Sequence, residues 1–134
     1  MVAKDEGYCF ACGKENPIGL HLEFNFENDK LTIIKNLPRE FQGYEGVSHG
    51  GIVTTLMDEA MSKFVQKKYL KNALTGRLKV RFYHPTPTGQ NLKITAWEVG
   101  KRENIVSTKS TVELEDGTIT AKAEAKFAIE ETDE

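Results

Sequence analysis

The sequence predicts an α+β domain in which one long helix is covered by an antiparallel sheet of about six strands. Three observations predict it: one apolar stripe with the period of a helix, several segments with the two-residue alternation of strands, and turn signals between them. A single long helix cannot bury its own apolar face, whereas a curved sheet wrapped around it can. We expect residues 1–134 to form this one domain.

The predicted elements follow one another as two strands, the helix and four further strands. Residues 1–19 are expected to form a loop, because glycines and a proline interrupt them. The helix is expected to begin near Ser48, a good N-cap residue, and to end around Tyr69. The strands are expected at residues 20–26, 31–37, 73–83, 92–99, 105–114 and 119–129. An acidic pair followed by glycine, at residues 115–117, predicts a hairpin turn between the last two strands.

Composition and charge exclude several classes of function. The chain is 39% hydrophobic and 28% charged, with a formal net charge of −2, so nothing points to nucleic acid or an anionic membrane as a partner. The polar N-terminus lacks the apolar region of a secretion signal, and no apolar stretch is long enough to cross a membrane. We therefore expect a cytoplasmic protein.

The two cysteines, Cys9 and Cys12, form a CxxC pair. Such a pair is half of a zinc site, a redox pair, or a tight turn with two small thiols, and the metal-free turn is favoured here. The missing zinc ligands would have to come from His21 or from a symmetric partner, because the chain has no further cysteine. Cys9 and Cys12 are kept as zinc candidates.

The start of the predicted helix carries the strongest chemical signal. Gly50 and Gly51 are expected to leave the N–H groups of the first turn bare and approachable. Together with the positive end of the helix dipole, these groups suit a carbonyl oxygen that gains negative charge. The helix also carries Asp58 and Glu59, which are costly to bury without a role or a partner. The combination predicts acyl-transfer chemistry.

The two acids are not equivalent on a helical wheel. Asp58 shares its flank with Thr54, Met61 and Val65, whereas the flank of Glu59 is more polar, with Thr55, Ser62 and Gln66. Asp58 is therefore expected to be enclosed, and Glu59 to be solvated or in a salt bridge. The alternative is that both are ordinary surface acids of an amphipathic helix. His49 either orients the loop and contacts the substrate or bonds to backbone at the helix start; the structural role is favoured.

The spacing along the helix predicts a dimer. Gly51 and Asp58 are seven positions apart, which corresponds to roughly 10 Å along the axis. One carbonyl group cannot reach both, because a hydrogen bond spans about 3 Å. If both act on one substrate they come from two helices, antiparallel across a two-fold axis, with two sites at the interface.

Three segments resemble one known family. Residues 43–60 read GYEGVSHGGIVTTLMDEA, residues 81–89 read RFYHPTPTG, and residues 9–20 read CFACGKENPIGL. The first resembles the hotdog-fold acyl-CoA thioesterases, in the branch of the 4-hydroxybenzoyl-CoA thioesterase superfamily that includes the phenylacetate-pathway thioesterase. In that branch an aspartate follows the His-Gly-Gly histidine by nine positions, as Asp58 follows His49. The resemblance covers residues 9–130.

The resemblance implies a hotdog fold, homodimers that often pair into tetramers, an acyl-CoA substrate and no cofactor. It implies that the N–H of Gly51, with that of Gly50, polarises the thioester carbonyl. Asp58 of the opposing subunit would act as general base or nucleophile, and Thr75 would orient the water. His49 completes the catalytic candidates.

The resemblance also suggests residues that contact substrate. Relatives carry an amide residue where this chain has Gly43, so its neighbour Gln42 is a substitute, and His84 stands where many relatives have an arginine near the CoA phosphates. The methionines of the helix could line an acyl pocket or simply belong to the core. The substrate-binding candidates are Gly50, Gln42, Glu59, Met57, Met61, Arg81 and His84.

The expected function is hydrolysis of an acyl-CoA to the free acid and CoA. The alternative is a hotdog module that binds acyl-CoA as a sensor without turnover, against which the acid in the helix argues. A hydratase or dehydratase on the same fold is a third possibility, although its motif is not found. The sequence does not predict the acyl group.

Overall fold

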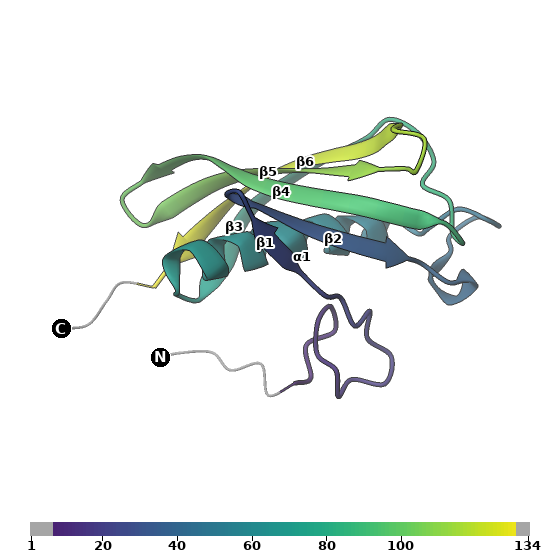
Figure 1. The fold of residues 1–134 in the computed structure, drawn as a ribbon, viewed down its shortest axis with the longest axis horizontal. Helices are drawn as coiled ribbons and strands as arrows, with labels where there is room; N and C mark the ends of the chain where they lie inside the picture. The colour runs from purple at the N-terminus through teal and green to yellow at the C-terminus, as the bar shows by residue number, and fades with distance from the viewer. Residues whose placement is uncertain (1–6, 131–134) are drawn as a thin grey trace.

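The computed structural model describes residues 7–130 and confirms the predicted fold class (Figure 1). Its elements are β1 (Asn25–Glu27), β2 (Lys30–Asn36), a short 3₁₀ turn η1 (Arg39–Phe41), α1 (Gly50–Tyr69), β3 (Ala73–Phe82), β4 (Asn91–Arg102), β5 (Ile105–Glu113) and β6 (Ile119–Ile129). The strands form one six-stranded sheet in the order β1-β2-β4-β5-β6-β3, and every neighbouring pair is antiparallel.

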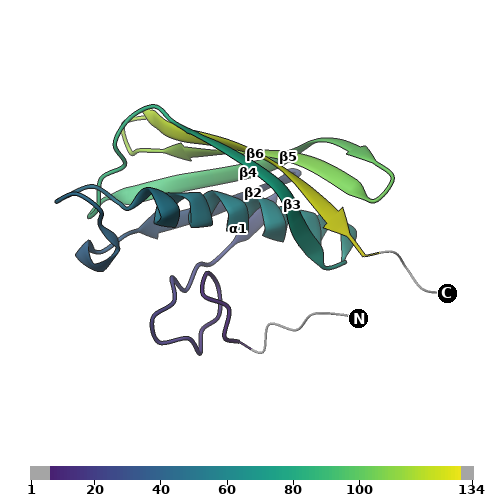
Figure 2. The same cartoon turned by 180° about the vertical axis from the view of Figure 1, so that it is seen from behind.

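The sheet curves over α1, and the two layers enclose the core (Figures 1 and 2). The apolar stripe of α1 is buried against the concave face, with Leu56 and Phe64 fully enclosed. Ile94 of β4 and Phe127 of β6 meet it from the sheet with no exposed surface. Burial of each such side chain stabilises the fold by about 1.5–3 kcal/mol, so the helix is held by packing rather than by its own propensity.

The helix begins one residue later than Ser48 would place it. The N-cap is His49, whose ring nitrogen Nδ1 accepts from the N–H of Gly51 at 3.0 Å. Ser48 is buried and faces elsewhere: its N–H donates to the carbonyl of Thr86 and its hydroxyl to that of Pro87. The prediction of Ser48 as N-cap is therefore wrong, because the Pro87 turn uses its hydroxyl.

The first predicted strand is also mostly wrong. Residues 20–24 are not part of the sheet, and only Asn25–Glu27 pairs with β2. Leu20 and Leu22 are buried as their alternation indicated, but their N–H groups donate to the carbonyls of Phe10 and Ala11 at 2.7 and 2.9 Å. The backbone of residues 20–22 thus pairs with the N-terminal segment. The other predicted strands differ from the observed strands only at their ends.

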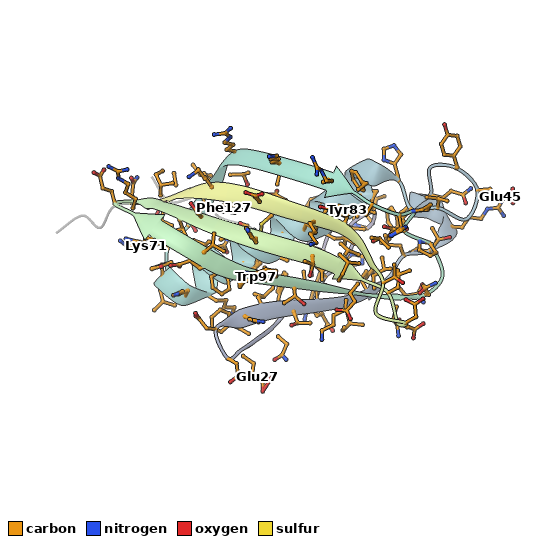
Figure 3. All side chains as sticks on the ribbon, turned by 90° about the horizontal axis from the view of Figure 1, so that it is seen from above. Glu27, Glu45, Lys71, Tyr83, Trp97 and Phe127 are labelled. Atoms are coloured by element: carbon orange, nitrogen blue, oxygen red, sulfur yellow. The ribbon has the colours of Figure 1, made fainter. Side chains whose placement is uncertain are left out.

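Strand β3 is an edge of the sheet, and no described residue pairs with its outer side. It is ten residues long and exposes Leu74 and Phe82. Figure 3 looks onto the convex face of the sheet, with Tyr83 just past the end of β3 and Trp97 on β4. A long edge strand with apolar side chains is a surface that natural proteins usually cover.

Among residues 7–130, no helix combines the length and apolarity that crossing a bilayer requires. The cytoplasmic location stays a prediction.

Candidate active site

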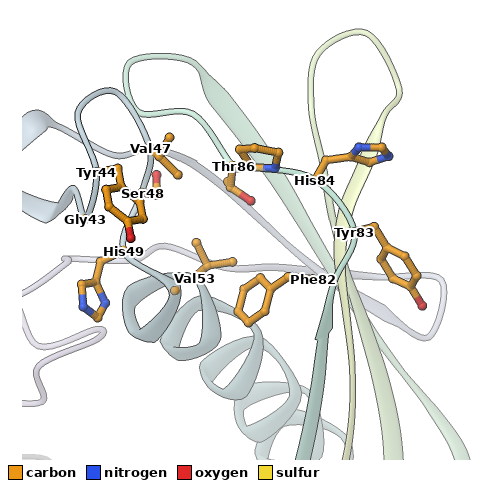
Figure 4. A pocket seen from close by; sticks show the side chains of 12 residues that line it. Gly43, Tyr44, Val47, Ser48, His49, Val53, Phe82, Tyr83, His84 and Thr86 are labelled. Carbon is orange, nitrogen blue, oxygen red and sulfur yellow. The ribbon is translucent and has the colours of Figure 1, made fainter.

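A cavity of about 740 Å³ lies at the N-terminal end of α1. One wall is the loop before the helix, including Tyr44 and His49, and the other is the chain that follows β3 (Figure 4). Phe82 leans toward the first turn of the helix, whereas Tyr83 and His84 point away from it. A Cβ atom on Gly50 would lie 3.6 Å from the ring of Phe82, so this ring closes over the backbone of the first turn.

The N–H groups of the first turn are not all open. The Gly51 N–H donates to His49 Nδ1, and the N–H groups of Ile52 and Val53 both donate to the carbonyl of His49 at 2.9 and 3.0 Å. The Gly50 N–H has no acceptor among residues 7–130, and Gly50 is exposed. The expectation of two bare N–H groups therefore holds for Gly50 and fails for Gly51.

His49 has a structural role in this geometry. Because its Nδ1 accepts a hydrogen bond, the ring proton lies on Nε2. The imidazole satisfies one of the N–H groups that a helix start leaves unpaired, as serine or asparagine does elsewhere. A carbonyl oxygen that binds the Gly50 N–H leaves this cap in place.

Asp58 and Thr75 form the second part of the candidate site. The Thr75 hydroxyl donates to Asp58 Oδ1 at 2.9 Å. Burial raises the pKa of the Asp58 carboxyl, and the hydrogen bond from Thr75 lowers it by a smaller amount. A half-buried carboxylate with a raised pKa is a stronger proton acceptor than an exposed aspartate, as a general base requires.

A β-bulge turns Thr75 toward the helix. Thr75 pairs with the buried Phe127, but the next pair is Arg77 with Lys126, which leaves Gly76 as an extra residue in β3. Beyond the bulge, Leu78 again faces the core. An extra residue re-aims its neighbours, and here it brings the hydroxyl of Thr75 onto Asp58.

Within one chain, the two parts of the candidate site do not meet. Asp58 is not among the residues that line the cavity at Gly50. Gly50 and Asp58 are eight positions apart on α1, which is about 12 Å of helix rise. A hydrogen bond spans about 3 Å, so one thioester cannot touch both groups of the same chain.

The substrate-binding candidates are dispersed. Gln42 holds its own loop, because its Oε1 accepts from the Gly46 N–H at 3.1 Å. His84 lines the rim of the cavity. Met57 and Met61 are fully enclosed in the core. Arg81 lies on β3 and lines a hollow on the convex face, away from the cavity. These positions give Gln42 and both methionines structural contacts.

Glu59 lies against the N-terminal segment. Cys12 forms side-chain hydrogen bonds with Glu59 and Cys9, and burial together with the Glu59 charge raises the pKa of the Cys12 thiol. The sequence predicts that Glu59 is solvated or in a salt bridge. It also offers His21 as a third ligand for a zinc ion. His21 instead bonds through Nε2 to the Asn16 carbonyl at 2.6 Å.

Several residues that line the cavity were not singled out from the sequence, Tyr44 and Phe82 among them. Phe82 could have been found from the sequence, because it is an inward-facing residue at the end of β3. It lies opposite Ala121 and shortly before Pro85 and Pro87. Nothing in the loop sequence distinguishes Tyr44.

Solved structures of the same fold are known. The chain is similar to protein RHA08564, a thioesterase superfamily protein, with a TM-score of 0.82 and 22% identity over 90% of this chain and 62% of that one. It is similar to smu.793 from Streptococcus mutans UA159 bound to acetyl CoA, with a TM-score of 0.77 and 19% identity over 90% and 98%.

A third similar structure is a hypothetical thioesterase from Streptococcus pneumoniae TIGR4 with coenzyme A. Its TM-score is 0.76, with 15% identity over 84% of this chain and 91% of that one. The same protein was also solved with an aspartate or a threonine replaced by alanine. At these identities the likeness shows the fold.

The family of the chain follows from its sequence. Comparison with curated proteins gave no match. The family model of the thioesterase superfamily matches residues 45–121, more than half of the chain, and that range includes His49, Gly50 and Asp58. The chain belongs to the thioesterase superfamily, and its enzyme class is therefore that of a thioester hydrolase.

Proposed function

We propose that the protein hydrolyses an acyl-CoA thioester to the free acid and CoA, at a site built from two copies of the chain. The observation that carries the proposal is the pair of complementary half-sites on α1. One is the Gly50 N–H, which has no acceptor in the part of the chain that the structure describes, and the other is a half-buried Asp58 bonded to Thr75. The first suits an oxyanion and the second suits a general base. Binding of CoA and acetyl CoA by proteins of this fold supports the substrate class.

In the proposed reaction, Asp58 Oδ2 takes a proton from a water while Thr75 holds Oδ1. The water oxygen bonds to the thioester carbon, and the carbonyl oxygen gains a negative charge that the Gly50 N–H stabilises. The C–S bond then breaks, and the departing thiolate takes the proton from Asp58. Aspartate and threonine are also the residue types replaced in the Streptococcus pneumoniae protein.

The uncovered edge of β3 supports a dimer. Thr75 lies on this edge strand and is exposed even though it contacts Asp58. A second copy packed here with its α1 antiparallel would bring its Gly50 to the Asp58 of the first, and two-fold symmetry would repeat the site. Pairing of dimers into tetramers stays a prediction from the family resemblance.

The first experiment measures thiol release from acetyl-, hexanoyl-, palmitoyl-, phenylacetyl- and benzoyl-CoA. The wild type should turn over at least one ester, and Asp58→Asn should lower kcat by about 10² to 10⁴-fold, the usual contribution of a general base. Glu124→Gln, an exposed acid on β6, is the matched control. Binding of an ester with no turnover would contradict the proposal and favour an acyl-CoA-binding module.

The second experiment tests the shared site. Gly50→Pro removes the N–H at the first helical position, where proline is well tolerated, and His49 already has the extended conformation that a following proline requires, with φ −60° and ψ 132°. Gly50→Ala keeps the N–H and is the control. Removal of the donor should lower kcat by about 10² to 10³-fold.

Mixing the two inactive variants then distinguishes one chain from two. In an equal mixture of Gly50→Pro and Asp58→Asn, half of the dimers are mixed and each has one intact site, so activity should return to about a quarter of wild type. A mixture that exchanges subunits and stays inactive would exclude a shared site.

A further inference from the structure

Cys9, Cys12 and Glu59 form a cluster away from the proposed active site. They are the only group within residues 7–130 whose side chains could together hold a metal ion, and one ligand atom from each lies within 4.8 Å of the others. All three side chains are half-buried. The N-terminal segment that carries the cysteines lies beneath α1, on the side away from the sheet (Figures 1 and 2).

The turn that presents the two thiols is tightly built. The Gly13 N–H donates to the carbonyl of Cys9 at 2.8 Å and closes the loop. A Cβ atom at Gly13 would lie 2.3 Å from the Cys9 nitrogen and 2.5 Å from the Gly7 oxygen, so only glycine fits. The backbone thus holds Cys9 and Cys12 side by side, in the arrangement in which a CxxC pair shares one ion.

The same segment is anchored to the core between the two cysteines and again at Leu20 and Leu22. Backbone hydrogen bonds join Leu20 to Phe10 and Leu22 to Ala11. Ala11, between the two cysteines, is buried in the core with Leu20 and Leu22. These contacts keep the thiols against Glu59, although the cysteines and the glutamate are far apart in sequence.

We propose that Cys9, Cys12 and Glu59 bind a zinc ion through two thiolates and one carboxylate oxygen, with water as the fourth ligand. Zinc takes tetrahedral sets of sulfur, nitrogen and oxygen ligands, at about 2.3 Å for sulfur and 2.0–2.2 Å for carboxylate oxygen. Ligand atoms around such an ion are about 3.5–3.8 Å apart, so the cluster needs only a small contraction. Both thiols lose their protons when the ion binds.

The charges around the cluster fit a cation. Two thiolates and a carboxylate carry three negative charges, which zinc reduces to one, and the positive charge of Lys63 lies near Cys12. The bound ion would fasten the N-terminal segment to α1 next to Asp58. This inference does not depend on the proposed thioesterase activity.

The test measures metal content and coordination in the full chain, purified under reducing conditions. Wild type stripped with EDTA and given zinc should retain about one equivalent after desalting. Cobalt(II) in its place should give the thiolate charge-transfer bands and tetrahedral d–d bands of a two-sulfur site. Cys12→Ser should abolish both signals. Because loss of an outer partner alone costs 10–100-fold in affinity, Glu59→Gln should weaken zinc binding by at least about 100-fold.

Glu124→Gln is the control for loss of a carboxylate and should bind zinc as the wild type does. Circular dichroism checks that each variant is folded, and the cobalt spectrum of wild type needs no variant at all. Less than about a tenth of an equivalent of zinc in the wild type would overturn the proposal. So would a Cys9–Cys12 disulfide in the reduced preparation, or wild-type affinity in Glu59→Gln.

Discussion

Asp58 and Glu59 are neighbours on α1, yet they meet different parts of the molecule. Asp58 faces the edge strand β3 and accepts a hydrogen bond from the Thr75 hydroxyl. Glu59 faces the N-terminal segment and is hydrogen-bonded to the Cys12 thiol. One residue turns the side chain by about 100° around the helix, and that rotation gives two adjacent acids two separate partners.

The difference shows what sets the role of an acid on a helix. Both side chains are half-buried, so exposure does not distinguish them. Their neighbours do: Asp58 has a hydroxyl beside it, which fits the proposed general base, whereas Glu59 has two thiols beside it, which complete the proposed ligand set. Experiments that change one flank and read out both functions test this separation.

The largest expected effect concerns the Asp58 flank. Thr75→Val removes the hydroxyl that holds Asp58 Oδ1 and should lower kcat by about 10- to 100-fold, because the base loses its orientation. Thr75→Ser keeps the hydroxyl and should stay near wild type. Zinc retention, measured on the same samples, should not change. Loss of zinc in Thr75→Val would show that the two flanks are coupled.

An intermediate effect is expected when metal is removed from the Glu59 flank. At zinc concentrations about 100-fold above the dissociation constant, the ion should stabilise the fold by about 2.7 kcal/mol. EDTA should therefore lower the melting temperature of wild type by several degrees. The same treatment should leave Cys12→Ser unchanged, since it has no bound ion to lose. A melting-temperature shift of equal size in both proteins would show that EDTA does not act by removing an ion from this cluster.

The smallest effect is a pH dependence of stability from Asp58. Burial raises its folded pKa above the ordinary value of 3.8, so the folded state holds the proton to higher pH than the unfolded chain does. The stability from the protonated form is complete below pH 3.8 and is lost as pH rises through the folded pKa. Asp58→Asn should therefore melt above wild type at pH 7, with the gap closing in acid. A gap that is constant with pH would contradict a raised pKa.

The helix and most strands could be predicted because their periodicities reflect burial. The stripe from Val53 to Phe64 and the alternation of β6 are properties of local sequence, and both are confirmed. The segment at Leu20 and Leu22 has the same alternation, but its backbone pairs with a loop rather than a strand. A pattern of buried side chains does not specify the partner of the backbone.

The candidate site was predictable only in part, because motifs carry some of its residues whereas side-chain orientation and tertiary packing decide the rest. Gly50, Asp58 and Thr75 come from motifs, and the structure brings the Thr75 hydroxyl to Asp58, while its role in orienting water stays a prediction. The hydrogen bond that takes up the Gly51 N–H depends on the orientation of the His49 ring, which sequence does not fix. The contact of Glu59 with Cys12 depends on tertiary packing between distant segments.

The extra residue at Gly76 shifts the alternation of inward-facing and outward-facing side chains by one position between the two halves of β3. With Gly76 present, Thr75 and Leu78 both face the helix although three positions separate them, which a regular strand forbids. Without it, the N-terminal half would turn over, so that Leu74 would face the helix and Thr75 the solvent. A single glycine without a side chain thus decides whether the strand presents a hydroxyl or an aliphatic group to Asp58.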